Sequence, residues 1–182
     1  LMKKITRETT GAFIIISVAY IASYTLVAGF IAPLQGLILP TFTTSISLLF
    51  LPHGIRVLAA YYYGWKALPL LLPSMYLMWF ITVYASNIPL HPLSPLLSGI
   101  ACIIAVKFVF KNIKYMIEKE WKLLLFAGLI GSFLNGLSHS FLVHKSFLTT
   151  SLIGYTIGDI LGQILLMIMF IYILKFIKLF KN

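Results

Sequence analysis

Long apolar stretches separated by short basic segments are the feature that most limits how this chain can fold. Apolar runs of about 20 residues recur along most of the sequence, and about 20 residues is the length that an α-helix needs to cross a bilayer. Hydrophobic residues make up 60% of the chain and charged residues 10%, whereas soluble domains carry roughly 25% charged residues. A water-soluble core cannot bury that much apolar surface, so the sequence predicts an integral membrane protein.

We expect one all-α domain, a bundle of six transmembrane helices. Pro33 marks the end of the first apolar run, and Pro52-His53-Gly54 interrupts the second. Because proline removes a backbone donor and clashes with the preceding turn, the second helix should be broken or kinked between Pro52 and Gly54. The predicted spans are residues 12–31, 42–63, 67–85, 95–110, 123–143 and 150–174.

Basic residues fall almost entirely on one side of these predicted spans. The chain has 14 Lys and Arg against 4 Asp and Glu, an excess that in a soluble protein would suggest nucleic acid. Loops taken alternately place Lys145 alone on one side, Arg56 inside the second span, and all other basic residues on the opposite side. Cytoplasmic loops carry the excess of Lys and Arg, so we expect both termini in the cytoplasm and no nucleic-acid partner. The cytoplasmic set is Lys3, Lys4, Arg7, Lys66, Lys107, Lys111, Lys114, Lys119, Lys122, Lys175, Lys178 and Lys181.

Asp159 is the one acidic residue inside a predicted span. About nine residues from the outer end, at 1.5 Å per residue, place it roughly 14 Å deep in the membrane. An ionised carboxylate at that depth has to be paired, solvated or protonated. Gln163 follows on the same helical face, and the four-residue spacing of Gly158 and Gly162 allows another helix to approach closely. Asp159 either ties helices together or helps to form a binding site.

Arg56 is the expected partner of Asp159, because it lies just beyond the break in the second span. A guanidinium at membrane depth would bind the carboxylate in a bidentate fork. If the second span ends at the break, Arg56 is instead a cytoplasmic anchor. His53 can satisfy backbone groups freed at the break, line a pocket or titrate near neutral pH, and the sequence leaves these alternatives open.

The fifth span adds Asn135 and His139, which share one helical face at a spacing of four residues. Several glycines reduce the side-chain volume along this helix, which permits close packing or leaves room for a ligand. His139, His144 and Asp159 lack a close-spaced metal motif such as HExxH, so we expect no metal site. The single cysteine, Cys102, is interpreted as a small buried apolar residue. No nucleophile elbow, carboxylate pair or phosphate loop is present, and we expect neither an enzyme nor a cofactor.

Two motifs resemble a known family. The first motif resembles the pattern of bacterial membrane-associated sensor domains of the first type. It consists of Leu51-Pro52-His53-Gly54-Ile55-Arg56 and continues to Gly64-Trp65-Lys66-Ala67-Leu68-Pro69. In that family the motif begins with a bulky residue, then Pro, any residue and Gly. A helix of small apolar residues comes next, and a Gly and a later Pro follow that helix. Gly158-Asp159-Ile160-Leu161-Gly162 is similar to the family's Gly-Asp-x-x-Gly, and the looser match covers about residues 40–175.

The resemblance implies a sensory module of the bacterial inner membrane, normally fused to a histidine kinase or diguanylate cyclase. The family usually has more spans than the six expected here, and no output domain follows the last predicted helix. A signal would therefore have to pass to a separate membrane or cytoplasmic protein.

Three functions remain open at this point. The chain is a sensory or accessory module that binds a small ligand or membrane partner near Arg56 and Asp159, a substrate-binding subunit of a vitamin or metal transporter, or a structural subunit of a membrane complex. Each requires partner proteins besides the lipid bilayer. The sequence does not identify the ligand.

Overall fold

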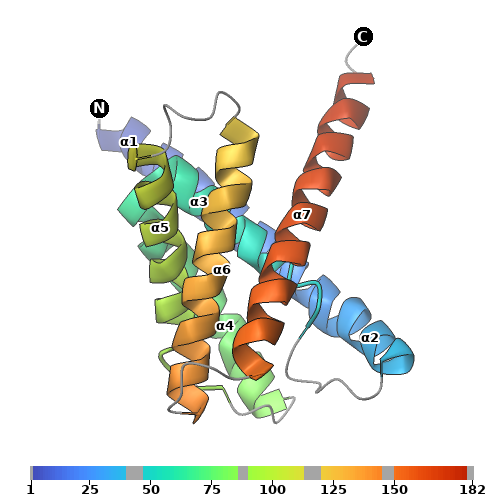
Figure 1. Ribbon diagram of the computed structural model, residues 1–182. Helices are drawn as coiled ribbons and strands as arrows, with labels where there is room; N and C mark the ends of the chain where they lie inside the picture. The colour runs from blue at the N-terminus through green and yellow to red at the C-terminus, as the bar shows by residue number, and fades with distance from the viewer. Residues whose placement is uncertain (1, 40–46, 86–89, 113–119, 145–149, 180–182) are drawn as a thin grey trace.

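The computed structural model describes residues 2–39, 47–85, 90–112, 120–144 and 150–179, and every regular element in these ranges is a helix (Figure 1). The elements are α1 (Met2–Leu26), the π-helix η1 (Val27–Ile31), α2 (Ala32–Ile38), α3 (Pro52–Tyr63), the 3-10 helix η2 (Gly64–Lys66), α4 (Ala67–Ala85), α5 (Ser94–Asn112), α6 (Glu120–His144) and α7 (Thr150–Leu179). Five helical stretches of the described chain are long and apolar enough to cross a membrane. The prediction of an all-helical membrane fold is confirmed at this level, and the count of six full helices is not.

The first helical stretch continues through Pro33, where the sequence predicted its end. Elements α1, η1 and α2 follow one another without a break from Met2 to Ile38. The π-turn shifts the backbone register, with the Ala32 N–H donating to the Val27 carbonyl, and Pro33 then stands in the first turn of α2. The proline is tolerated inside this continuous helix because the π-turn just before it departs from regular i→i−4 pairing.

The second predicted span, residues 42–63, is helical only from Pro52 onward. Its residues 42–46 lie outside the described residues, and residues 47–51 are not helical. The 12 residues of α3, at 1.5 Å each, are about 18 Å long, which is too short to cross a bilayer. Pro52 therefore begins the helix, and the interruption precedes residues 52–54. The N–H groups of His53 and Gly54 donate to the Phe50 and Leu51 carbonyls.

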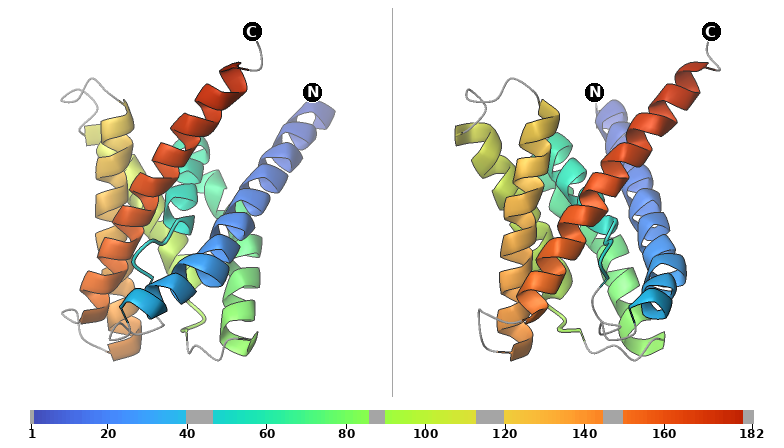
Figure 2. Two further views of the ribbon diagram at one scale, coloured as in Figure 1. Left: turned by 90° about the vertical axis from the view of Figure 1, so that its right-hand side faces the viewer. Right: turned by 45° about the vertical axis from the view of Figure 1, so that its right-hand side comes forward.

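Gly64 reverses the chain between α3 and α4. Its φ is +55°, a backbone conformation that residues with a Cβ rarely adopt. The following 3-10 turn leads into α4, which runs back alongside α3 (Figure 2). Gly64, Trp65 and Lys66 thus form a tight turn that brings α4 back against α3.

Replacing Gly64 with alanine is expected to lower the free energy of unfolding by about 1–3 kcal/mol, since an L-residue is strained at this combination of φ and ψ. The added Cβ would meet the Lys107 side chain at an ordinary 3.8 Å, so the loss would come from the backbone. Thermal unfolding in detergent measures it. Gly36→Ala is the matched control, because nothing lies within 4 Å of its Cβ position. Equal melting temperatures for both variants would contradict the expectation.

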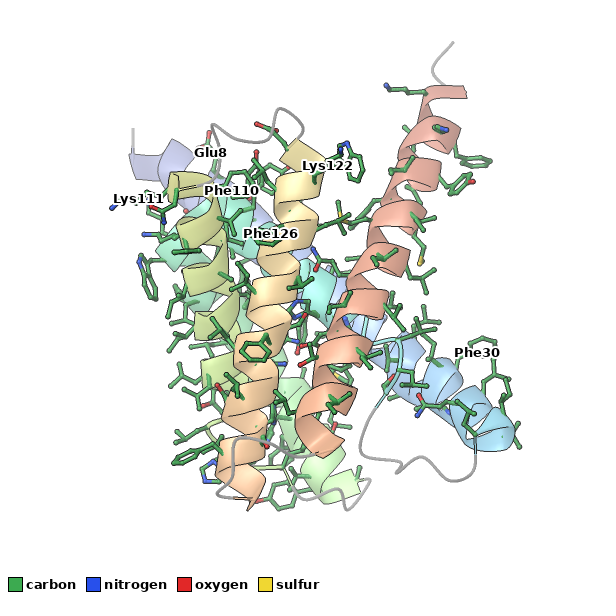
Figure 3. All side chains as sticks on the ribbon, viewed as in Figure 1. Glu8, Phe30, Phe110, Lys111, Lys122 and Phe126 are labelled. Atoms are coloured by element: carbon green, nitrogen blue, oxygen red, sulfur yellow. The ribbon has the colours of Figure 1, made fainter. Side chains whose placement is uncertain are left out.

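Helix α3 lies at the centre of the bundle and contacts α1, α4, α5, α6 and α7. The neighbouring pairs α5–α6 and α6–α7 form one side, and α1 packs against α4 on the other (Figures 1 and 2). Apolar side chains cover the outer surface, where lipid would contact them, and both termini lie at one end, together with Glu8, Lys111 and Lys122 (Figure 3). Because other helices surround α3, its charged residue Arg56 lies inside the bundle.

Gly158 and Gly162 of α7 form a contact with the non-helical segment 47–50, which we call the glycine contact. The Phe50 N–H lies 2.9 Å from the Gly158 carbonyl oxygen. A Cβ at Gly158 would overlap the Ser47 carbonyl oxygen, and a Cβ at Gly162 would overlap the Phe50 backbone. The spacing of these glycines was interpreted as allowing another helix to approach closely, whereas the segment 47–50 is not helical. The neighbour is the chain segment that leads into α3.

Candidate functional site

Asp159 lies in the bundle interior and is 2% exposed. Within the described part of the chain, its carboxylate accepts contacts from three side chains. Arg56 Nη2 is 3.4 Å from Oδ1, His53 Nδ1 is 3.2 Å from Oδ2, and Asn135 Nδ2 is 2.6 Å from Oδ2. We call His53, Arg56, Asn135 and Asp159 the polar cluster. It joins three helices, α3, α6 and α7, around one carboxylate.

Arg56 is 2% exposed, so the interpretation as a cytoplasmic anchor is wrong. Its contact with Asp159 is a single N–H···O contact through Nη2 rather than the expected bidentate fork. The second carboxylate oxygen already accepts from His53 and Asn135. The guanidinium also lies over the Phe50 ring, with Cζ 5.5 Å from the ring centroid. Arg56 is therefore held between α7 and the segment that precedes α3.

His53 links the polar cluster to α6. Its Nε2 lies 3.1 Å from the Gly128 carbonyl oxygen and 3.1 Å from the Ser132 hydroxyl oxygen. The Ser132 hydroxyl donates to the same carbonyl at 2.8 Å. Cys102 Sγ is 3.8 Å from Nδ1. The His53 ring is fully buried and connects Asp159 with a neighbouring helix, so it does not satisfy the backbone at the break.

Ser98 extends the hydrogen-bond network to α5. Its hydroxyl donates to Asn135 Oδ1 at 2.6 Å, and its oxygen lies 3.5 Å from His139 Nε2. The His139 ring stacks on Tyr155 of α7, with centroids 4.6 Å apart and an interplanar angle of 22°. The two polar residues predicted on one face of α6, Asn135 and His139, are thus both part of this region.

Gln163 lies outside the polar cluster, although it shares a helical face with Asp159. Its Nε2 donates to the Leu124 carbonyl at 2.9 Å. A Cβ at Gly128 would overlap the Gln163 amide, so this glycine makes room for the side chain. Gln163 ties α7 to α6 and contributes to packing of the two helices.

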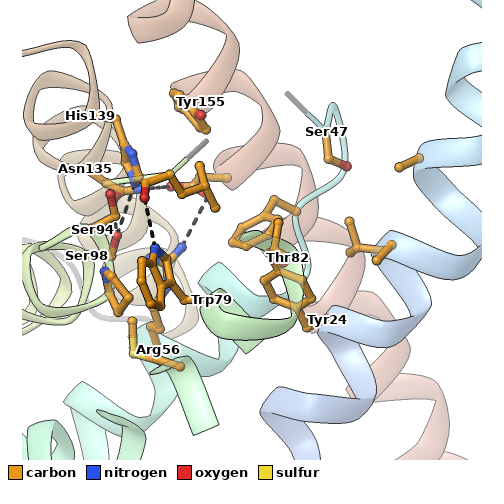
Figure 4. A pocket seen from close by; sticks show the side chains of 18 of the residues that line it. Tyr24, Ser47, Arg56, Trp79, Thr82, Ser94, Ser98, Asn135, His139 and Tyr155 are labelled. Carbon is orange, nitrogen blue, oxygen red and sulfur yellow. Dashed lines mark hydrogen bonds and ion pairs between the residues drawn. The ribbon is translucent and has the colours of Figure 1, made fainter. Parts of the chain in front are cut away.

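A cavity of about 460 Å³ lies beside the polar cluster (Figure 4). Arg56, Asn135 and Asp159 line it, and His53 does not. Ring side chains from four helices and the segment 47–50 form much of the remaining wall. They are Tyr20, Tyr24, Phe50, Trp79, His139 and Tyr155. The arrangement is a mostly apolar chamber with a few convergent polar groups, which is typical of small-molecule sites.

Sequence reasoning missed three small residues that contact the cluster, namely Ser98, Cys102 and Ser132. Cys102 is fully buried, as predicted, and its sulfur also lies near the His53 ring. A signal was present in the spacing, because Ser94, Ser98 and Cys102 recur every four residues and share a face of α5. Residues this small are also common in helix packing, so the spacing alone did not single them out.

Replacing Ser98 with alanine is expected to lower the free energy of unfolding by roughly 1–2 kcal/mol, because Asn135 Oδ1 would lose its buried donor. Chemical unfolding in detergent, followed by tryptophan fluorescence, measures the loss. Ser138→Ala is the control, since the Ser138 hydroxyl donates to the Leu134 carbonyl of its own helix. A Ser98→Ala protein as stable as Ser138→Ala would show that the network does not depend on this hydroxyl.

The arrangement favours binding over acid–base chemistry. The Asp159 carboxylate already accepts from three side chains, which leaves it poorly placed to take a proton from a substrate. The described residues contain no group of three or more His, Cys, Asp or Glu suited to a metal ion. No protein family model, curated protein or solved structure matches the chain.

Proposed function

We propose that this chain is a membrane-embedded sensory or accessory module that binds a small ligand inside its helix bundle. The observation that carries the proposal is the cavity of about 460 Å³ against the polar cluster. Small-molecule sites have volumes of roughly 300–1,000 Å³. Charged residues inside membrane spans are costly and are by default candidates for a functional site.

The position of the charges supports ligand binding over a purely structural ion pair. A structural pair is best shielded by close packing on all sides, because unpaired polar surface at membrane depth is costly. Here both Arg56 and Asp159 line the cavity wall. Their charges can therefore act on a molecule that enters it.

The helices that line the cavity offer a route for a signal. Tyr20 and Tyr24 come from α1, and Tyr155 and Asp159 come from α7. Both of these helices extend to the end of the bundle that holds the termini (Figure 1). A ligand that draws α1 and α7 together would change this end, where a separate partner protein would read the change.

We also propose six membrane crossings, with both termini in the cytoplasm of a bacterial cell and the bundle in its inner membrane. Segment 47–51 and α3 would together make the second crossing. Two observations support this orientation, the one-sided distribution of Lys and Arg and the position of Glu8, Lys111 and Lys122 at the end with the termini (Figure 3).

Mass spectrometry of molecules that co-purify with the chain tests the ligand-binding function. Ala32 lines the cavity, so Ala32→Trp should fill it. Ala22→Trp is the control, because Ala22 is exposed on α1 and does not line the cavity. We expect one small molecule to accompany the wild-type chain and Ala22→Trp but not Ala32→Trp. Equal recovery with all three proteins, or no such molecule with any, would overturn the proposal.

The partner protein separates the sensory role from transport. Cross-linking in native membranes should capture a kinase or cyclase if the module is sensory. Capture of an ATPase together with a scaffold subunit would replace the sensory role with that of a transporter's substrate-binding subunit. The ligand cavity is compatible with either role, so this result decides between them.

A further inference from the structure

We infer that the cavity recognises an uncharged ring-containing molecule that presents a hydrogen-bond acceptor to Arg56 and a donor to His139. This inference rests on the ligand-binding role proposed above and adds the chemical class of the ligand. It is carried by polar atoms that the protein leaves unpaired on residues lining the cavity.

Three buried polar atoms of cavity-lining residues have no partner in the described structure. They are Arg56 Nε, Ser94 Oγ and His139 Nδ1. The residues are 2%, 5% and 8% exposed, respectively. Buried polar groups are nearly always hydrogen-bonded in folded proteins. Unpaired atoms on residues that line a cavity therefore indicate where a ligand can complete the bonding.

The hydrogen-bond network fixes what Arg56 and His139 can offer. Arg56 Nε–H can only donate. The Ser98 hydrogen goes to Asn135 Oδ1, so the Ser98 oxygen accepts from His139 Nε2–H at 3.5 Å. In a neutral imidazole the other nitrogen, Nδ1, then carries the lone pair and accepts. The Ser94 hydroxyl can serve either way.

Arg56 and His139 are not adjacent in the wall. A hydrogen-bond path through Asp159, Asn135 and Ser98 separates Arg56 from His139, and Figure 4 shows the two side chains apart. A ligand that meets both must therefore carry its acceptor and its donor at separate positions on a ring system. A ligand whose two polar groups are adjacent would reach either Arg56 or His139 and leave the other residue unpaired.

The charges already in the wall favour an uncharged ligand. Arg56 and Asp159 both line the cavity and are paired with each other. An anion would lie near the Asp159 carboxylate and a cation near the Arg56 guanidinium, and a further buried charge is costly at membrane depth.

Flat apolar surfaces make up the remaining wall. Trp79 Nε1 donates to the Leu90 carbonyl at 3.2 Å, and the Tyr24 hydroxyl lies 2.8 Å from Thr82 Oγ1. Because these polar tips are bonded within the protein, their rings offer apolar faces to the cavity. The stacked rings of His139 and Tyr155 add another. Aromatic faces pack well against flat rings. A lipid tail would fill the space but leave the three unpaired atoms without partners.

Four matched probes test this chemistry by isothermal titration calorimetry on the purified chain in detergent at slightly acidic pH. Para-hydroxybenzophenone offers an acceptor and a donor, and benzophenone offers an acceptor alone. Diphenylmethane has no polar group, and para-benzylbenzoate is an anion. We expect para-hydroxybenzophenone to bind at least about tenfold more tightly than diphenylmethane, because hydrogen bonds to the wall separate the two. Benzophenone should fall between them, and para-benzylbenzoate should bind most weakly.

Substitutions assign this preference to the named atoms. His139→Phe keeps a ring against Tyr155 and removes Nδ1, so the advantage of para-hydroxybenzophenone over benzophenone should vanish. Ser94→Ala should reduce binding of the hydroxylated probe. Ser74→Ala is the control, since the buried Ser74 hydroxyl donates to the Leu71 carbonyl and does not line the cavity. An unchanged preference in His139→Phe would overturn the assignment of the donor to His139.

The outcomes separate this inference from the proposed function. Tightest binding of para-benzylbenzoate that Ala32→Trp abolishes would make the uncharged class wrong and leave a ligand-binding cavity. Equal binding of diphenylmethane and para-hydroxybenzophenone would show that no polar recognition occurs. No binding of any probe would overturn the inference, while co-purification decides the ligand-binding function independently.

Discussion

Replacing Asp159 with asparagine is expected to lower the free energy of unfolding by about 3–5 kcal/mol, the usual effect of removing one partner of a buried ion pair. Arg56 would remain buried without a counter-charge. The contacts from His53 and Asn135 would also meet a neutral amide instead of a carboxylate. Reversible unfolding in mixed micelles, followed by circular dichroism, measures the change.

A double-mutant cycle with Arg56→Gln tests whether the two charges act as a pair. The double variant should lose clearly less stability than the sum of the single variants, because the second substitution removes a charge that the first left unpaired. Glu120→Gln is the control, since this exposed carboxylate contacts Tyr61 at 3.2 Å and surface contacts contribute little. Additive losses at Arg56 and Asp159 would contradict the pairing.

The chemical cost of charge in a membrane made the central part of the site predictable. Arg56 and Asp159 stood out because a charged side chain inside an apolar run needs a partner. Asn135 and His139 stood out through their shared helical face. The structure brings all four to the cavity wall. Gln163 had the same kind of signal, yet it bonds to the Leu124 carbonyl, because a helical face is wide enough to contact two neighbours.

Backbone details depended on contacts that local sequence does not encode. Pro33 has the signature of a helix end, but the π-turn before it allows the helix to continue. Pro52 was recognised as a break, but a sequence does not reveal that the preceding residues cross α7 without helical structure. That path depends on the space beside Gly158 and Gly162, which lie far along the chain.

Phe50 connects the glycine contact with the ligand site. Its backbone N–H lies 2.9 Å from the Gly158 carbonyl oxygen, and its ring lies beneath the Arg56 guanidinium and lines the cavity. Any change that displaces this residue from α7 therefore changes the surroundings of Arg56. Packing of the chain against two glycines and recognition of a ligand are coupled through one side chain.

Replacing Gly162 with alanine is expected to lower the free energy of unfolding by about 3 kcal/mol, the upper end of the usual range for overpacking. The added Cβ would overlap the Phe50 backbone, which cannot rotate away as the end of a side chain can. The same substitution should weaken binding of para-hydroxybenzophenone, because Phe50 would move. Reversible unfolding and calorimetry on one preparation measure both effects.

Substitutions at two further glycines test whether overlap with the Phe50 backbone causes the expected loss of stability in Gly162→Ala. Gly11→Ala should leave binding unchanged and raise stability by at most about 1 kcal/mol, since nothing lies within 4 Å of its Cβ position and alanine favours the helix. Gly128→Ala should have an intermediate effect, because its obstacle is the Gln163 amide, which can rotate at the cost of its bond to Leu124. If Gly162→Ala were as stable as Gly11→Ala, segment 47–50 could not pack against α7 as closely as described. The path of the second crossing would then have to differ.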